Sequence, residues 1–114
     1  MITIDAKDKT LGRVASAAAK ALLGKRSADF AKNVVIKDGV TIEHASQIML
    51  SGNNKARDMK YVRYSGYPGG QKIENYSMLT ARLGNAEAIR RAVLGMLPKN
   101  RLQTKRIKLL TIEK

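Results

Sequence analysis

Basic and tyrosine side chains are interleaved in one short stretch of the sequence, between residues 53 and 70. Tyr61, Tyr64 and Tyr67 recur there at a spacing of three, among lysines and arginines. Lysine and arginine neutralise phosphates and aromatic rings stack on bases or ribose, so this combination indicates contact with nucleic acid. The alternative is that the three rings cover the domain's own surface, and the sequence alone does not decide between the two for any one ring.

A glycine-rich turn at residues 66–70 closes this stretch. Glycine allows a backbone amide to approach a phosphodiester closely. The turn lacks the glycine spacing of a dinucleotide-binding loop and follows a basic segment, so we expect no cofactor there. Gly24-Lys25 does not complete a phosphate loop either, because Ala19 and Arg26 stand where that motif requires Gly and then Ser or Thr.

The charge balance favours a polyanionic partner. The 114 residues include 22 Lys plus Arg against 9 Asp plus Glu, which gives a net charge of +13. Residues 1–37 hold eight basic and three acidic groups and residues 85–114 hold eight and two, so both ends are electropositive. There is no Trp and one Phe, which disfavours a membrane-surface helix, and no apolar run has the length of a bilayer span. Contact with RNA at several places fits this distribution.

Catalytic and metal sites have no support in the sequence. There is no Cys and His44 is the only His, which disfavours zinc sites and thiol chemistry. The acidic residues are scattered, mostly beside basic ones, and no pair of them suggests acid–base catalysis. We therefore expect a protein that is not an enzyme and holds no cofactor. The lack of Cys and of a signal-peptide pattern leads us to expect a cytoplasmic protein.

The elements that must position the basic residues follow from the hydrophobic pattern. Residues 1–5 alternate apolar and polar side chains and predict a strand. Apolar residues at helical spacing over residues 11–22 predict a helix, with Asp8 or Thr10 as its cap and Gly24 as its end.

The segment after this helix allows two interpretations. Residues 40–42 are β-branched and predict a strand, and residues 34–36 have a similar composition. Asp38-Gly39 between them is a turn signal, so the two runs form a hairpin, or residues 34–36 are irregular and only the second run is a strand. The sequence leaves both open.

Two more strands and one more helix complete the pattern. Residues 48–50 and 107–112 are apolar runs of strand length, and Asn85 is expected to cap a helix that ends before Pro98. The order of strands and helices predicts an α/β protein with a largely parallel sheet between helices. The length fits a single domain, residues 1–114.

Several of these segments together resemble the L-thirteen family of large-subunit ribosomal proteins. They occur in the family's order and cover nearly the whole chain. The Gly-Met-Leu-Pro-Lys-Asn segment at residues 95–100 is the most specific, whereas the Gly-Lys pairs are weak signals. The matching stretches are residues 4–6, 10–16, 23–25, 51–55, 64–70 and 93–100.

The resemblance implies a three-layer α/β/α single domain with a central, largely parallel sheet of about four strands. It implies binding to 23S-type large-subunit rRNA, a role in early subunit assembly, neighbouring ribosomal proteins as partners, and no membrane or small-molecule substrate. It also places an arm at about residues 53–70 and a basic segment at residues 98–106 against RNA. The residues expected to bind rRNA are Arg13, Lys25, Arg26, Asn53, Asn54, Lys55, Lys60, Arg63, Tyr64, Ser65, Tyr67, Lys99, Asn100, Arg101, Lys105 and Arg106.

This chain departs from the family pattern at the glycine turn, where many members have His before Ser or Thr and this sequence has Tyr64-Ser65. Its short length fits a bacterial-type member. The leading hypothesis is a structural rRNA-binding protein of the large subunit. Two others remain: a regulatory RNA-binding protein that acts outside the ribosome, and a small α/β enzyme that uses a phosphorylated ligand.

Overall fold

The computed structural model describes residues 1–114 and contains two separate sheets. Three strands form a parallel sheet in the order β1-β2-β5, and β3 pairs with β4 in an antiparallel hairpin. In chain order the elements are β1 Ile2–Asp5, α1 Leu11–Leu23, β2 Val40–Glu43, the 3-10 helix η1 Ala45–Gln47, α2 Lys55–Asp58, β3 Lys60–Tyr64, β4 Gln71–Asn75, α3 Tyr76–Leu83, α4 Asn85–Met96, α5 Gln103–Ile107 and β5 Leu110–Ile112.

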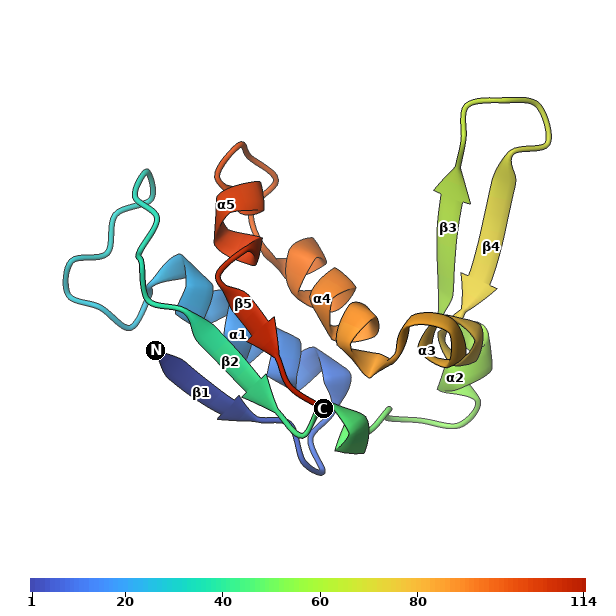
Figure 1. Ribbon diagram of the computed structural model, residues 1–114, viewed down its shortest axis with the longest axis horizontal. Helices are drawn as coiled ribbons and strands as arrows, with labels where there is room; N and C mark the ends of the chain where they lie inside the picture. The colour runs from blue at the N-terminus through green and yellow to red at the C-terminus, as the bar shows by residue number, and fades with distance from the viewer.

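The parallel sheet turns one apolar face toward the helices. In the register, Ile4 of β1 is paired with Ile42 of β2, and Val40 of β2 is paired with Leu110 of β5. Because side chains alternate along a strand, these residues share one face. Figure 1 shows α1 behind this sheet, with α4 beside it. Val40, Ile42 and Leu110 are buried in the resulting core.

The two long helices supply the rest of the core. Alanine occupies much of the buried face of α1, and short side chains let α4 pack closely against it. Gly24 ends α1 with φ +75°, as expected, and a Cβ there would collide with the Ile36 side chain. The buried residues of the two helices are Leu11, Val14, Ala15, Ala18, Ala19, Ala21, Leu22, Ala88, Ile89 and Val93.

The α/β class and the parallel sheet predicted from the sequence are confirmed. The sheet has three strands where about four were expected, because residues 48–50 form only an isolated bridge between Met49 and Thr10. Of the three layers implied by the resemblance, the sheet and one helical layer are present. Thr3 and Thr111 are exposed on the opposite face, and no helix lies in front of the sheet in Figure 1.

Two other segments resolve or correct expectations from the sequence. Residues 34–36 are irregular, so of the two interpretations left open, the one with a strand beginning at Val40 is confirmed. The expected strand at residues 107–112 is shorter, because Ile107 ends α5 and only Leu110–Ile112 pairs with β2. Pairing with the central strand, and not apolar composition alone, sets the extent of this strand.

The middle of the chain is more regular than its composition suggests. The expected arm forms α2 and β3, and β4 then leads directly into α3, a helix that the sequence pattern did not indicate. The cap of α4 is Gly84 and not Asn85, whose side chain instead donates to the carbonyl oxygen of Ser46 at 3.3 Å. The β3–β4 hairpin projects from the body in Figure 1, which explains a radius of gyration of 15.1 Å, against about 13 Å for a compact domain of this length.

Candidate nucleic-acid interface

The hairpin carries the tyrosine-bearing stretch away from the rest of the protein. Its strands are joined by residues 65–70, where the amide of Ser65 donates to the carbonyl of Gly70 at 3.3 Å and the amide of Gly70 donates to that of Tyr67 at 3.0 Å. Gly66 and Gly69 adopt φ values of +88° and +72°, which favour glycine. The tip therefore has a defined turn that presents Tyr67, which is 75% exposed.

One face of the hairpin is apolar, aromatic and basic, and it is exposed. Val62 and Ile73 are opposite each other in the register and are 57% and 54% exposed. Lys60 and Tyr64 lie on the same face as Val62, because side chains two residues apart point the same way along a strand. Exposed apolar surface beside positive charge is typical of a contact surface. We call Lys60, Val62, Tyr64 and Ile73 the hairpin contact face.

The other face of the hairpin is anchored to the body through Tyr61. The guanidinium carbon of Arg91 in α4 lies 5.3 Å from the centre of the Tyr61 ring, a cation–π geometry. The Tyr61 hydroxyl donates to the sulfur of Met59 at 3.3 Å. Burial raises the pKa of Tyr61. This ring covers the protein's own surface, so of the three tyrosines only Tyr64 and Tyr67 are exposed for stacking.

Glu74 in β4 is the second anchor. The Arg82 guanidinium donates Nε and Nη2 to the two carboxylate oxygens of Glu74, both at 2.8 Å. These bonds hold the pKa of Glu74 below its usual range. Arg63 approaches the same carboxylate at 3.9 Å and is half exposed. Part of the Arg63 charge is therefore already balanced inside the protein.

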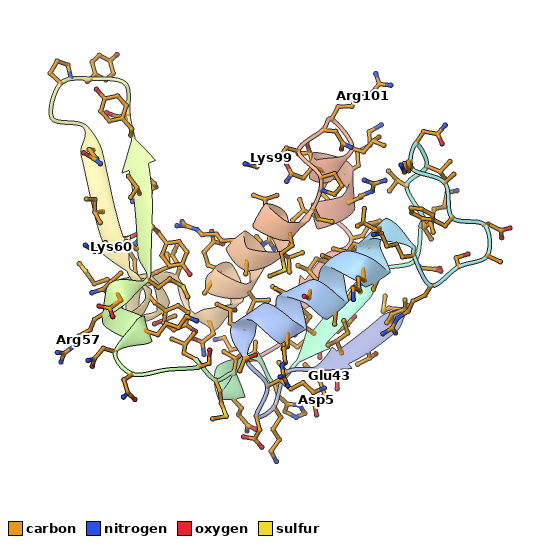
Figure 2. All side chains as sticks on the ribbon, turned by 180° about the vertical axis from the view of Figure 1, so that it is seen from behind. Asp5, Glu43, Arg57, Lys60, Lys99 and Arg101 are labelled. Carbon is orange, nitrogen blue, oxygen red and sulfur yellow. The ribbon has the colours of Figure 1, made fainter.

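A second basic region lies between α4 and α5. Figure 2 shows Lys99 and Arg101 at a distance from Lys60 and Arg57, which lie near the hairpin base. Lys99, Arg101 and Lys105 are exposed, as the resemblance implied. The Asn100 side chain accepts a hydrogen bond from the amide of Leu102 at 3.1 Å, so this residue also shapes the loop.

Arg106 differs from the other predicted contact residues because it is only 1% exposed. Its Nη2 donates to the carbonyl oxygens of Lys32 and Val34 at 3.1 and 3.3 Å. The side chain thus fixes the segment between α1 and β2 against α5. Its position inside the basic run 105–108 did not distinguish it from its exposed neighbours.

The remaining predicted residues do not gather in one place. All of them are exposed to solvent. They are Arg13, Lys25, Arg26, Asn53, Asn54, Lys55, Ser65 and Asn100. Lys55 borders a cavity with Tyr61 and Arg91, while Lys25 borders another with Arg106. The amide of Lys25 donates to the carbonyl of Lys20, as expected after a helix end, and so is not free to bind phosphate.

Some basic residues near these surfaces were not singled out from the sequence. Lys72 is opposite Arg63 in the hairpin, and Arg82 and Arg91 hold the hairpin to α3 and α4. Lys32 borders the Arg106 cavity. The sequence could have indicated Lys72 if residues 60–64 had been paired with the residues that follow the glycine turn, as in a hairpin. The roles of Arg82 and Arg91 depend on tertiary packing and have no local signal.

Asp5 and Glu43 lie apart from these basic regions, unlike Glu74, which lies within the hairpin. In Figure 2, Asp5 and Glu43 lie together at one end of the parallel sheet, away from the labelled lysines and arginines. Asp5 accepts a hydrogen bond from the amide of Lys7 at 2.9 Å and lies 3.0 Å from Nδ1 of His44, and these contacts lower its pKa. No group of three or more His, Asp or Glu residues is placed to hold a metal ion. None of the helices combines the length and apolar character required to cross a bilayer.

Comparison with known proteins identifies similar sequences along nearly the whole chain. The family model described as "Ribosomal protein L13" matches residues 1–112. "Large ribosomal subunit protein uL13" of Pelotomaculum thermopropionicum is 43% identical over 109 residues, which are 96% of this chain and 74% of that protein. The proteins of the same name from Bordetella petrii and Moorella thermoacetica are 45% and 43% identical, also over 96% of this chain, and over 75% and 74% of their own lengths.

Proposed function

The chain belongs to the ribosomal protein L13 family, and from this premise we propose that it is a structural constituent of the large ribosomal subunit that binds 23S-type rRNA. In this proposal the chain acts as one domain in the cytoplasmic ribosome, contacts neighbouring large-subunit proteins, and supports early assembly of the subunit. It catalyses no reaction and uses neither a cofactor nor a small-molecule substrate.

The observation that carries the proposal is the hairpin contact face. Val62, Tyr64 and Ile73 are each more than half exposed, although residues of these types are usually buried. Lys60 on the same face supplies a charge for phosphate, and the tyrosine ring supplies a flat surface for a base or ribose. A projecting arm that is anchored at its base fits a surface that recognises the shape of folded RNA.

The spread of positive charge supports the same proposal. The arm and the loop before α5 are distinct basic regions, and the acidic residues Asp5 and Glu43 lie elsewhere. Several separate phosphate contacts provide affinity, while the fit of the arm to RNA shape provides specificity. The exposed residues proposed to contact rRNA are Arg13, Lys25, Arg26, Asn53, Asn54, Lys55, Lys60, Arg63, Tyr64, Ser65, Tyr67, Lys99, Asn100, Arg101 and Lys105.

Fractionation of a native cell extract on a sucrose gradient tests the assignment. We expect the chain to migrate with the large subunit at low salt and to remain there at moderate salt. Migration in a pool free of subunits would contradict the proposal and would favour a regulatory RNA-binding protein that acts outside the ribosome.

Paired lysine substitutions test the arm itself. Replacing Lys55 and Lys60 with Ala should weaken binding to a large-subunit rRNA fragment and lower the salt slope of binding by about two units, because each lysine neutralises one phosphate. The matched control replaces Lys7 and Lys9, which are also exposed but lie near Asp5, and removes the same charge. Equal weakening in both variants would mean that only net charge matters and that the arm is not the contact surface.

A further inference from the structure

The Arg106 side chain is a buried cation without an anionic partner. It is 1% exposed, forms no ion pair, and its Nε has no hydrogen-bond partner. An arginine stays charged at all physiological pH values, so it cannot relieve burial by losing a proton. Two backbone carbonyls hold Nη2, but carbonyl dipoles do not neutralise a full charge.

Arg106 also borders a cavity of about 260 Å³. The other lining residues include Lys25, Lys32 and Asn100, and none of the seven is acidic. Lys25 and Lys32 lie in the segment after α1, whereas Arg106 lies in α5, so positive side chains from two distant parts of the chain converge. The cavity has more than eight times the roughly 30 Å³ that a water molecule occupies in the liquid, so a phosphate group with waters fits.

We propose that this cavity is a binding site for one backbone phosphate of an RNA, with Arg106 at its base and Lys25 and Lys32 at its rim. We call it the Arg106 phosphate site. It rests on the proposed function and adds a specific contact to it, made by a residue that is hidden from the surface. The exposed ring of Phe30, which also borders the cavity, is placed beside the nucleotide that carries this phosphate.

The physical reason is charge compensation. A buried charge without a partner costs free energy, and an anion that enters the cavity removes this cost while gaining charge-assisted hydrogen bonds. Phosphate suits the site because its oxygens accept from a guanidinium and two ammonium groups at once. Salt screens a phosphate contact with a buried guanidinium less than it screens a contact with an exposed lysine.

Thermal unfolding of the RNA-free protein in inorganic phosphate is the first test. At phosphate concentrations ten times the dissociation constant, Tm should exceed that in chloride of equal ionic strength by about 4 °C or more. Arg106→Met should lose this difference; because it also removes the hydrogen bonds to the carbonyls of Lys32 and Val34, its own Tm in chloride is the reference. Phosphate also stabilises proteins in general, because it is excluded from their surface. The test therefore compares the phosphate-dependent rise in Tm of the wild type with that of Arg106→Met.

A second variant keeps the test decisive if Arg106→Met does not fold. Replacing both Lys25 and Lys32, which are exposed, with Ala should reduce the phosphate-dependent shift without unfolding the protein. Replacing both Lys20 and Lys37 with Ala is the matched control, because it removes the same charge from exposed residues that do not border the cavity. Equal phosphate stabilisation in the wild type and in every variant would overturn the proposal.

Ethylation interference on a large-subunit rRNA fragment tests whether an RNA phosphate binds at the Arg106 phosphate site. One phosphate whose ethylation weakens binding of the wild type should cease to do so in the Lys25/Lys32 variant, and the salt slope should fall by one to two units. Wild-type binding to rRNA without such a position would refute the phosphate site and leave the proposed function standing. Phosphate stabilisation without any binding to large-subunit rRNA would refute the proposed function and reduce the cavity to a site for small anions.

Discussion

The sheet body and the β3–β4 hairpin use the same residue types in opposite ways. Ile89 in α4 and Ile42 in β2 are fully buried, whereas Ile73 and Val62 in the hairpin are more than half exposed. Burial of apolar side chains stabilises the body, and the hairpin gains little from it. The residues that fold this protein and those proposed to contact rRNA are therefore largely separate.

The hairpin nevertheless needs support, because an isolated two-stranded hairpin is at best marginally stable in water. Its support comes from the face opposite the contact face, through the Tyr61–Arg91 and Glu74–Arg82 contacts. These contacts join the base of the arm to α3 and α4 without covering the surface that it presents. The arm is thus anchored mainly by polar and aromatic contacts, and the body by its apolar core.

The largest expected effect is a difference between the two regions in how much one substitution lowers the free energy of unfolding. Ile89→Ala should lower the free energy of unfolding by about 2–5 kcal/mol, because it leaves a cavity in the core. Ile73→Ala, the same substitution in the hairpin, should change it by less than about 0.5 kcal/mol but weaken binding to rRNA. Urea denaturation measures the first quantity and filter binding the second. Similar losses of stability in the two variants would contradict the division of roles.

A smaller effect sharpens the comparison within the tyrosines. Tyr64→Ala should weaken rRNA binding by about 1–3 kcal/mol, the usual contribution of a ring stacked on a base, and leave urea stability unchanged. Tyr64→Phe should retain most of the affinity, since the ring remains. If the phenylalanine variant binds as weakly as the alanine variant, the hydroxyl and not stacking makes the contact.

The division between the regions also explains what the sequence could predict. The strand at residues 1–5, the α1 helix and its end at Gly24 depend on local patterns, and the structure has all three. The strands predicted at residues 48–50 and 107–112 depend on which neighbours pair across the sheet. The apolar runs there predicted more strand than the structure has. Local periodicity identifies an element, but partners far away in the sequence decide where pairing stops.

The candidate site was predictable in a similar way. Composition and spacing indicated the arm, and the exposed positions of Tyr64, Tyr67 and Lys60 agree with a surface role. The same pattern could not separate Tyr61 from the other tyrosines, nor Arg106 from its exposed neighbours. Both are decided by contacts with residues 30 or more positions away, Arg91 and Lys32.

The smallest expected effect concerns the anchor at Glu74. Its pKa is lowered in the folded protein by the Arg82 hydrogen bonds, so this contact contributes stability above the pKa of an unfolded glutamate, about 4.3, and loses it as the pH falls through the lower folded value. Because Arg82 stays charged, only protonation of Glu74 breaks the pair.

Amide exchange locates this effect in the hairpin and not in the body. Below pH 4, protection of the β3–β4 amides, corrected for intrinsic exchange, should fall more than that of the β2 amides in the core. Glu74→Gln should lower hairpin protection already at neutral pH and remove its acid dependence. An unchanged pH profile in that variant would mean that other carboxylates hold the arm, and that the anchor lies outside the Glu74–Arg82 pair.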